Sequence, residues 1–261
     1  MIYKGFKTLT EYTSIALYPI MIDFLSFMIA FIVYGFHYHS TISFKFSINP
    51  GLPSISDLLE NPNVIHSVNF SLDGANSLGS FSLLIIFMFI FLAFIEGGFI
   101  GLLHKGARGE DANFHIFLRY GKKHWLDFIV VLIIQLALLF VLFIMMVPFM
   151  IPGIFFGMFL LFVLRILFIF WEFTIVTDEL RPIDALKKSR FYFKTRIPET
   201  FGVIFSILIF NLISGLIINQ MSSPIFYMIF IIMYGYVATG FQFALMHTFH
   251  ESKKEGIPNT L

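Results

Sequence analysis

The sequence predicts an all-α, polytopic integral membrane protein with six transmembrane helices. Hydrophobic residues make up 58% of the chain and charged residues only 13%, whereas soluble domains have about 45–50% and about 25%. Several apolar runs are longer than the roughly 20 residues that a helix needs to cross a bilayer. These runs are continuous rather than alternating, which excludes the strands of a membrane β-barrel.

We expect a single membrane domain over residues 1–261. The spans are predicted at about 12–36, 79–104, 125–147, 154–176, 200–218 and 225–248. The N-terminal segment resembles the basic start of a signal peptide, but the apolar run behind it is too long, and no small-residue cleavage site follows. We therefore expect the first span to be retained.

The connections between the spans differ in length and character. A polar outer loop rich in Ser, Asn, Pro and Gly occupies 37–78, and short interfacial helices are expected within it at 54–60 and 63–68. Pro148, Pro152 and Gly153 predict a tight turn between the third and fourth spans.

Lysine and arginine are segregated to one side of the predicted topology. Fifteen of the seventeen fall before the first span, in the linkers 105–124 and 177–198, or in the C-terminal tail. The exceptions are Lys45 in the outer loop and Arg165 within a span. The positive-inside rule therefore predicts that both termini and both linkers are cytoplasmic. We accordingly expect a multi-pass protein of the plasma membrane.

Both cytoplasmic linkers are predicted to form amphipathic helices at the inner leaflet. The first has acidic residues at its start and basic residues at its end, which complements a helix dipole. The second begins at Pro182, which suits a first helical position, and its apolar stripe consists of Ile183, Leu186, Phe193 and Ile197. The bases expected to contact anionic headgroups are Arg119, Lys122, Lys123, Lys187, Lys188, Arg190, Lys194 and Arg196. The alternative is that both linkers are ordinary connectors with some helicity.

Acidic residues at corresponding positions around the two linkers also suggest a parallel internal repeat. Glu96 and Glu172 precede the linkers at similar places, and Asp127 and Glu199 follow them. Such a repeat relates two halves of a membrane domain by an axis along the membrane normal. Identity between the halves is low, so chance likeness is the alternative.

A set of polar residues within the spans is the main candidate for function. A charge at mid-bilayer costs at least about 2.5–3.5 kcal/mol, so it needs a partner or water. Arg165 and Glu172 would lie about 10 Å apart along one continuous helix, so we expect Arg165 to pair with Asp23 or Glu96 instead. The predicted network is Asp23, Glu96, Gln135, Arg165, Glu172, Asn211 and Gln242. It is either a path for a substrate, proton or ion, or a set of structural contacts that fix helix register.

Signatures of cofactor or metal chemistry are not found in the sequence. There are no cysteines, which rules out disulfides and thiolate sites. His247 and His250 are spaced to share a helix face, but no HExxH motif and no third ligand accompany them. No GxSxG motif or phosphate-binding glycine loop occurs. We expect no metal, no cofactor and no catalytic residues.

The stretch WEFTIVTDELRPIDALKKSRFYFK resembles a broad prokaryotic group of six-span membrane proteins of unknown function. It is similar also to the membrane domain attached to some glycerophosphoryl diester phosphodiesterases. Ala185, Leu186 and Ser189 match the Ala-Leu-x-x-Ser helix of that group, after Pro182 and Asp184. The resemblance implies an accessory membrane module that serves transport, secretion or lipid handling.

These observations lead to three alternative functions. The first is a non-enzymatic accessory or assembly module of a transport, export or lipid-handling system. The second is a small transporter or channel that uses the intramembrane charges, and the third is a membrane-embedded lipid-modifying enzyme that uses His104 or His247 with nearby acids. The expected partners are the lipid bilayer, with anionic headgroups at the cytoplasmic face, and a protein in the membrane; no nucleic acid is expected.

Overall fold

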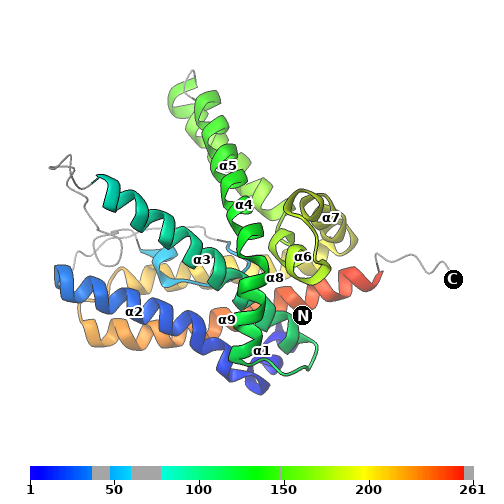
Figure 1. The fold of residues 1–261 in the computed structure, drawn as a ribbon, viewed down its shortest axis with the longest axis horizontal. Helices are drawn as coiled ribbons and strands as arrows, with labels where there is room; N and C mark the ends of the chain where they lie inside the picture. The colour runs from blue at the N-terminus through cyan, green and yellow to red at the C-terminus, as the bar shows by residue number, and fades with distance from the viewer. Residues whose placement is uncertain (37–47, 60–77, 147–148, 256–261) are drawn as a thin grey trace.

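The computed structural model describes residues 1–36, 48–59, 78–146 and 149–255, and this part of the chain is helical without strands (Figure 1). The predicted all-α fold is confirmed, since six helices are long and apolar enough to cross a membrane. The α-helices are α1 (Ile2–Glu11), α2 (Leu17–Tyr34), α3 (Leu78–Ala107), α4 (Phe114–Met146), α5 (Met150–Leu167), α6 (Trp171–Asp178), α7 (Pro182–Thr195), α8 (Ile197–Ile218) and α9 (Pro224–Glu255). The 3₁₀ helices η1 (Thr13–Ala16) and η2 (Ile55–Leu58) complete the set.

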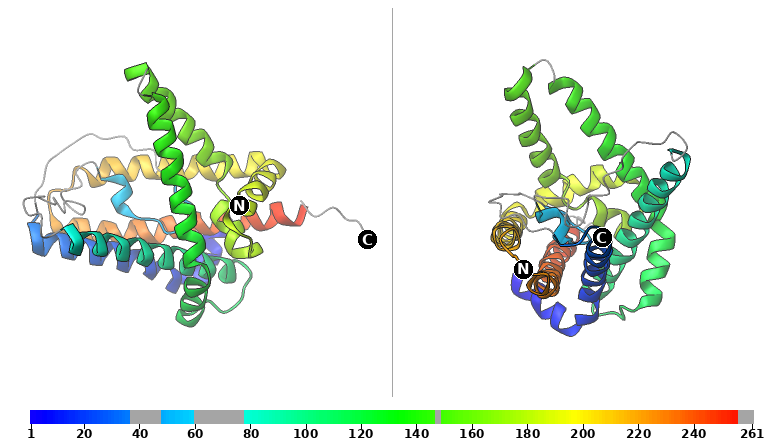
Figure 2. Two further views of the ribbon diagram at one scale, coloured as in Figure 1. Left: turned by 45° about the horizontal axis from the view of Figure 1, so that its top comes forward. Right: turned by 90° about the vertical axis from the view of Figure 1, so that its left-hand side faces the viewer.

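Helices α2, α3, α8 and α9 run alongside one another, and the α4–α5 hairpin projects away from them (Figures 1 and 2). Phe140 and Phe143 on α4 and Phe155 and Phe156 on α5 are exposed. In a bilayer such side chains meet lipid tails that are as apolar as they are. The exposed hairpin is therefore compatible with a membrane environment.

The largest apolar core lies where α3, α6 and α9 meet. Phe99, Leu103, Phe173, Phe243 and Phe249 are all completely buried there. The two N-terminal elements pack onto the same region, since α1 and η1 both contact α9. We call this end of the bundle, which holds α1, α7 and the last turns of α9, the basic end.

Helix α1 is separate from the first span, which the sequence did not predict. It packs on α9 through glycines: a Cβ added to Gly5 would lie 2.5 Å from the backbone nitrogen of Ala244. Small residues allow helices in membranes to approach this closely. Lys4 also forms an ion pair with Glu251, with Nζ and Oε1 2.7 Å apart. The N-terminus is thereby fixed against the C-terminal helix.

The two linkers are built differently. The second contains the separate helix α7, which begins at Pro182 as predicted. The first contains no separate helix, because α3 continues to Ala107 and α4 begins at Phe114 and runs without a break into the third span. The predicted linker helix is therefore the first part of α4 and not an element of its own. Asn113 caps α4 by accepting a hydrogen bond from the backbone N–H of Ile116 (3.1 Å).

Helix α7 is fixed to its neighbours by buried polar contacts. The indole N–H of Trp171 donates to the carbonyl of Pro182 (2.7 Å). The Asp178 carboxylate, whose side chain is only 3% exposed, pairs with Lys188 at 2.7 Å and with Lys253 of α9. Tyr192 donates to the same carboxylate (2.8 Å). One acidic group therefore joins α6, α7 and α9.

Candidate functional site

An irregular segment, residues 48–59, lies inside the helical bundle and organises its polar side chains. Its backbone forms no regular helix apart from η2. Irregular backbone at membrane depth is tolerated only where protein or water satisfies its N–H and C=O groups. Most of the predicted intramembrane polar residues supply such contacts here.

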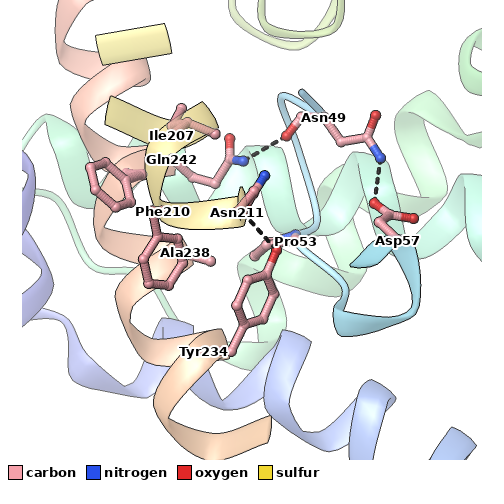
Figure 3. A pocket seen from close by; sticks show the side chains of 10 residues that line it. Asn49, Pro53, Asp57, Ile207, Phe210, Asn211, Tyr234, Ala238 and Gln242 are labelled. Carbon is pink, nitrogen blue, oxygen red and sulfur yellow. Dashed lines mark hydrogen bonds between the residues drawn. The ribbon is translucent and has the colours of Figure 1, made fainter. Parts of the chain in front are cut away.

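Gln242 of α9 binds the backbone of residues 49–51 through both the oxygen and the nitrogen of its side-chain amide. Its Oε1 accepts a hydrogen bond from the backbone N–H of Gly51 (3.1 Å), and its Nε2 donates to the carbonyl of Asn49 (2.7 Å; Figure 3). Asn219 holds the other end of the segment by donating to the carbonyl of Leu58 (3.1 Å). These two amides therefore position the segment along most of its length.

Asp23 of α2 binds the start of η2. Its carboxylate accepts hydrogen bonds from the hydroxyl of Ser54 (2.6 Å) and from the backbone N–H of Ile55 (2.8 Å). The side chain is almost completely buried. Because its acceptors are engaged by the segment, Asp23 is not the partner of Arg165.

Arg165 pairs with Glu172, and the predicted pairing with Asp23 or Glu96 is wrong. Nη1 of Arg165 and Oε1 of Glu172 are 2.5 Å apart, and Nε donates to the carbonyl of Ile48 (3.1 Å). The prediction assumed one continuous helix. Instead α5 ends at Leu167 and α6 begins at Trp171, so the turn between them brings the two charges together.

Glu96 of α3 lies against the same segment at Gly51. A Cβ added to Gly51 would be 1.7 Å from Oε1 of Glu96, and Gly51 has a φ of +133°. Both the space and the backbone conformation therefore require glycine. The carboxylate also faces the backbone N–H of Leu52. Within the described part of the chain, Glu96 forms no ion pair.

Four residues of the predicted network line one cavity of about 200 Å³ between α3, α4, α5 and α6. They are Glu96, Gln135, Arg165 and Glu172, with apolar neighbours that include Leu92. Gln135 and Leu92 are exposed on the outer surfaces of α4 and α3. The cavity therefore opens on the outer surface of these two apolar helices. The Glu172 side chain is 5% exposed, and its Oε2 has no hydrogen-bond partner among the described residues.

The other members of the network lie elsewhere. Asn211 and Gln242 line a second cavity of about 20 Å³, roughly the size that holds one water molecule. Asn211 accepts a hydrogen bond from the hydroxyl of Tyr234 (3.2 Å; Figure 3). Asp23 lines neither of these two cavities. The predicted network is thus divided into separate groups around the segment.

The predicted basic contacts divide into exposed and paired residues. Arg119, Lys122, Lys187, Arg190 and Lys194 are exposed on α4 and α7.

The remaining bases join elements at the basic end. Lys188 pairs with Asp178, Arg196 with Glu251 (2.7 Å), and Lys123 with Glu179 (2.5 Å). The hydrogen bond from Lys123 lowers the pKa of Glu179 from its usual value.

The predicted apolar stripe of α7 does not form one face. Phe193 is buried and Leu186 half-buried, whereas Ile183 and Ile197 are exposed. The exposed face of α7 carries Ile183 among its bases, while Phe193 packs into the core. The helix is therefore held by its buried face and presents a mixed basic and apolar surface.

The histidines expected to share a helix face have different partners. Nε2 of His250 lies 3.0 Å from Nδ1 of His104. Nε2 of His247 forms a hydrogen bond with the hydroxyl of Thr8 (2.8 Å). In the described residues, no group of three His, Cys, Asp or Glu side chains is placed to hold a metal.

Gly51, Asn219 and Asp178 are organising residues that were not predicted from the sequence. Of these, Gly51 carried a signal, because a Pro-Gly pair within a polar loop marks a turn. It did not indicate that the turn enters the bundle.

Comparisons of this chain with protein-family models, with curated proteins and with solved structures find no match. The resemblance of 171–194 to the six-span group therefore stays a prediction.

Proposed function

We propose that this chain is a non-enzymatic integral membrane module of a lipid-handling system, which binds the polar group of an amphiphile in the 200 Å³ cavity. The observation that carries the proposal is the position of this cavity. Charged groups line its interior, and its rim lies on the bilayer-facing surfaces of α3 and α4. A lipid can place its headgroup there while its tails stay along the exposed apolar helices.

The division of the polar network favours this function over a transporter or channel. Asp23 and Gln242 bind the backbone of the segment 48–59, so they hold structure where a path would require open space. The third function, a lipid-modifying enzyme, has less support because His104 and His247 do not line the cavity.

The proposal includes a location in the plasma membrane with both termini in the cytoplasm. Its support is the segregation of basic residues in the sequence and the ion pair of Lys4 with Glu251, which joins the two ends of the chain. The exposed bases Lys187, Arg190 and Lys194 would then face anionic headgroups of the inner leaflet. A protein partner in the membrane remains part of the proposed accessory role.

The proposal is tested by the lipid that stays bound after purification in detergent, measured by native mass spectrometry. Leu92→Trp enlarges a side chain at the cavity rim, and Ile209→Trp makes a comparable change on α8; both residues are 45% exposed. We expect wild type and Ile209→Trp to retain lipid equally, and Leu92→Trp to retain much less. Equal retention by both variants, or none by wild type, would contradict the proposal.

A further inference from the structure

The cavity contains more hydrogen-bond acceptors than the protein satisfies. Oε2 of Glu172 is buried without a partner in the described residues, although the other oxygen binds Arg165. A buried polar atom left unsatisfied costs about 1–3 kcal/mol, and more when it is charged. The carboxylate of Glu96 and the amide of Gln135 line the same space. Three acceptor groups thus converge on one volume.

The charges of the cavity are also unbalanced. Its lining has two carboxylates and one guanidinium, and the guanidinium is paired with Glu172. Glu96 is therefore left without an ion-pair partner among the described residues. A buried carboxyl group ionises only at a high cost unless a cation lies beside it. A bound cation that donates hydrogen bonds would be that partner.

We propose that the cavity binds a primary ammonium group, carried by the headgroup of an aminophospholipid. The inference rests on the proposed function and deepens it by naming the headgroup. An ammonium has three N–H donors, which match Oε2 of Glu172, the carboxylate of Glu96 and the amide oxygen of Gln135. A metal ion fits less well, since no group of three suitable ligands occurs in the described residues.

Arg165 accounts for the phosphate that accompanies such an ammonium. A guanidinium has five N–H donors, and two of those of Arg165 are used on Glu172 and on the carbonyl of Ile48. Donors are left to bind a phosphate oxygen beside the carboxylates. The volume of this cavity is about 200 Å³, whereas the cavity beside Asn211, which has room for one water molecule, is about 20 Å³. The larger space suits a compact zwitterionic headgroup.

The test is an equilibrium titration of the full-length protein in detergent with two short-chain lipids and one free amine. The ligands are dihexanoyl phosphatidylethanolamine, dihexanoyl phosphatidylcholine and ethanolamine. The two lipids differ only by methylation of the nitrogen, which removes every N–H donor. We expect the ethanolamine lipid to bind about tenfold more tightly or better. Free ethanolamine should bind more weakly than that lipid, because it lacks the phosphate and the tails.

Variants assign the binding to this cavity. Glu96→Gln should weaken binding of the ethanolamine lipid about tenfold or more, since it removes the carboxyl group that would pair with the ammonium. Gln135→Leu should weaken it as well, and because Gln135 is exposed this variant is expected to stay folded. Glu199→Gln, which removes an exposed charge outside the cavity, is the control and should bind as wild type does.

The outcomes separate the inference from the proposed function. Equal affinity for the two lipids, both weakened by Leu92→Trp, would overturn the ammonium inference and leave the proposed function standing. Tight binding of ethanolamine with no binding of either lipid would support an ammonium site for a soluble amine and overturn the lipid function. If no ligand binds, or if Glu96→Gln and Gln135→Leu both bind as wild type does, the cavity holds water only and the inference is wrong.

Discussion

The pairing of Arg165 with Glu172 makes a sharp prediction about stability. Arg165→Met keeps the bulk of the side chain but leaves Glu172, whose side chain is 5% exposed, without its partner. Breaking a buried pair in this way costs about 3–5 kcal/mol. Because the Arg165 side chain is 25% exposed, we expect a loss of about 3 kcal/mol, at the lower end of that range.

The second step of the experiment identifies the partner. Neutralising the partner of Arg165 should restore the free energy of unfolding. The double variant Arg165→Met/Glu172→Gln is therefore expected to lie within about 1 kcal/mol of wild type, and Arg165→Met/Glu96→Gln should recover much less. The free energy of unfolding is measured by circular dichroism during titration of detergent micelles with SDS, as a double-mutant cycle. Recovery with Glu96→Gln but not with Glu172→Gln would refute the pairing, and an unchanged stability of Arg165→Met would show that the pair is not structural.

Two further predictions concern the segment and the basic end. Gly51→Ala should destabilise the fold by at least about 1–3 kcal/mol because of the positive φ alone, and the contact of the new Cβ with Glu96 should add a further loss. In the same SDS titration, Gly51→Ala/Glu96→Ala should recover only that further loss. Asp178→Asn removes the charge that joins Lys188 and Lys253, and because these lysines are 44% and 34% exposed, it should cost about 1 kcal/mol. Faster amide hydrogen exchange in α7, with α8 unchanged, is the expected sign; equal exchange in both helices would contradict this role for Asp178.

The break between α5 and α6 explains why the partner of Arg165 was predicted wrongly from the sequence. Residues 168–170 separate the two helices, yet this stretch contains only Phe and Ile. Helix breaks are expected at Pro or Gly, and neither occurs there. The pairing of Arg165 and Glu172 depends on this turn, so a rule based on helical spacing gave the wrong partner.

The continuous α4 illustrates a second limit. The predicted boundary at 124–125 marked the point where basic residues give way to apolar ones. Charge changes the environment that a helix prefers but does not interrupt its backbone hydrogen bonds. Helix α4 therefore continues from Phe114 to Met146 through that boundary.

Local sequence was enough to predict the membrane class, the six long apolar helices, the helix start at Pro182 and the identity of the charges that need partners. These properties follow from local composition and from residue chemistry, which hold wherever the chain folds. By contrast, it took the folded structure to show that residues 48–59 enter the bundle and that Glu96, Gln135, Arg165 and Glu172 surround one cavity. Those arrangements depend on contacts such as that of Gly51 with Gln242, between residues far apart in the chain, and local sequence patterns carry no information about which distant groups meet.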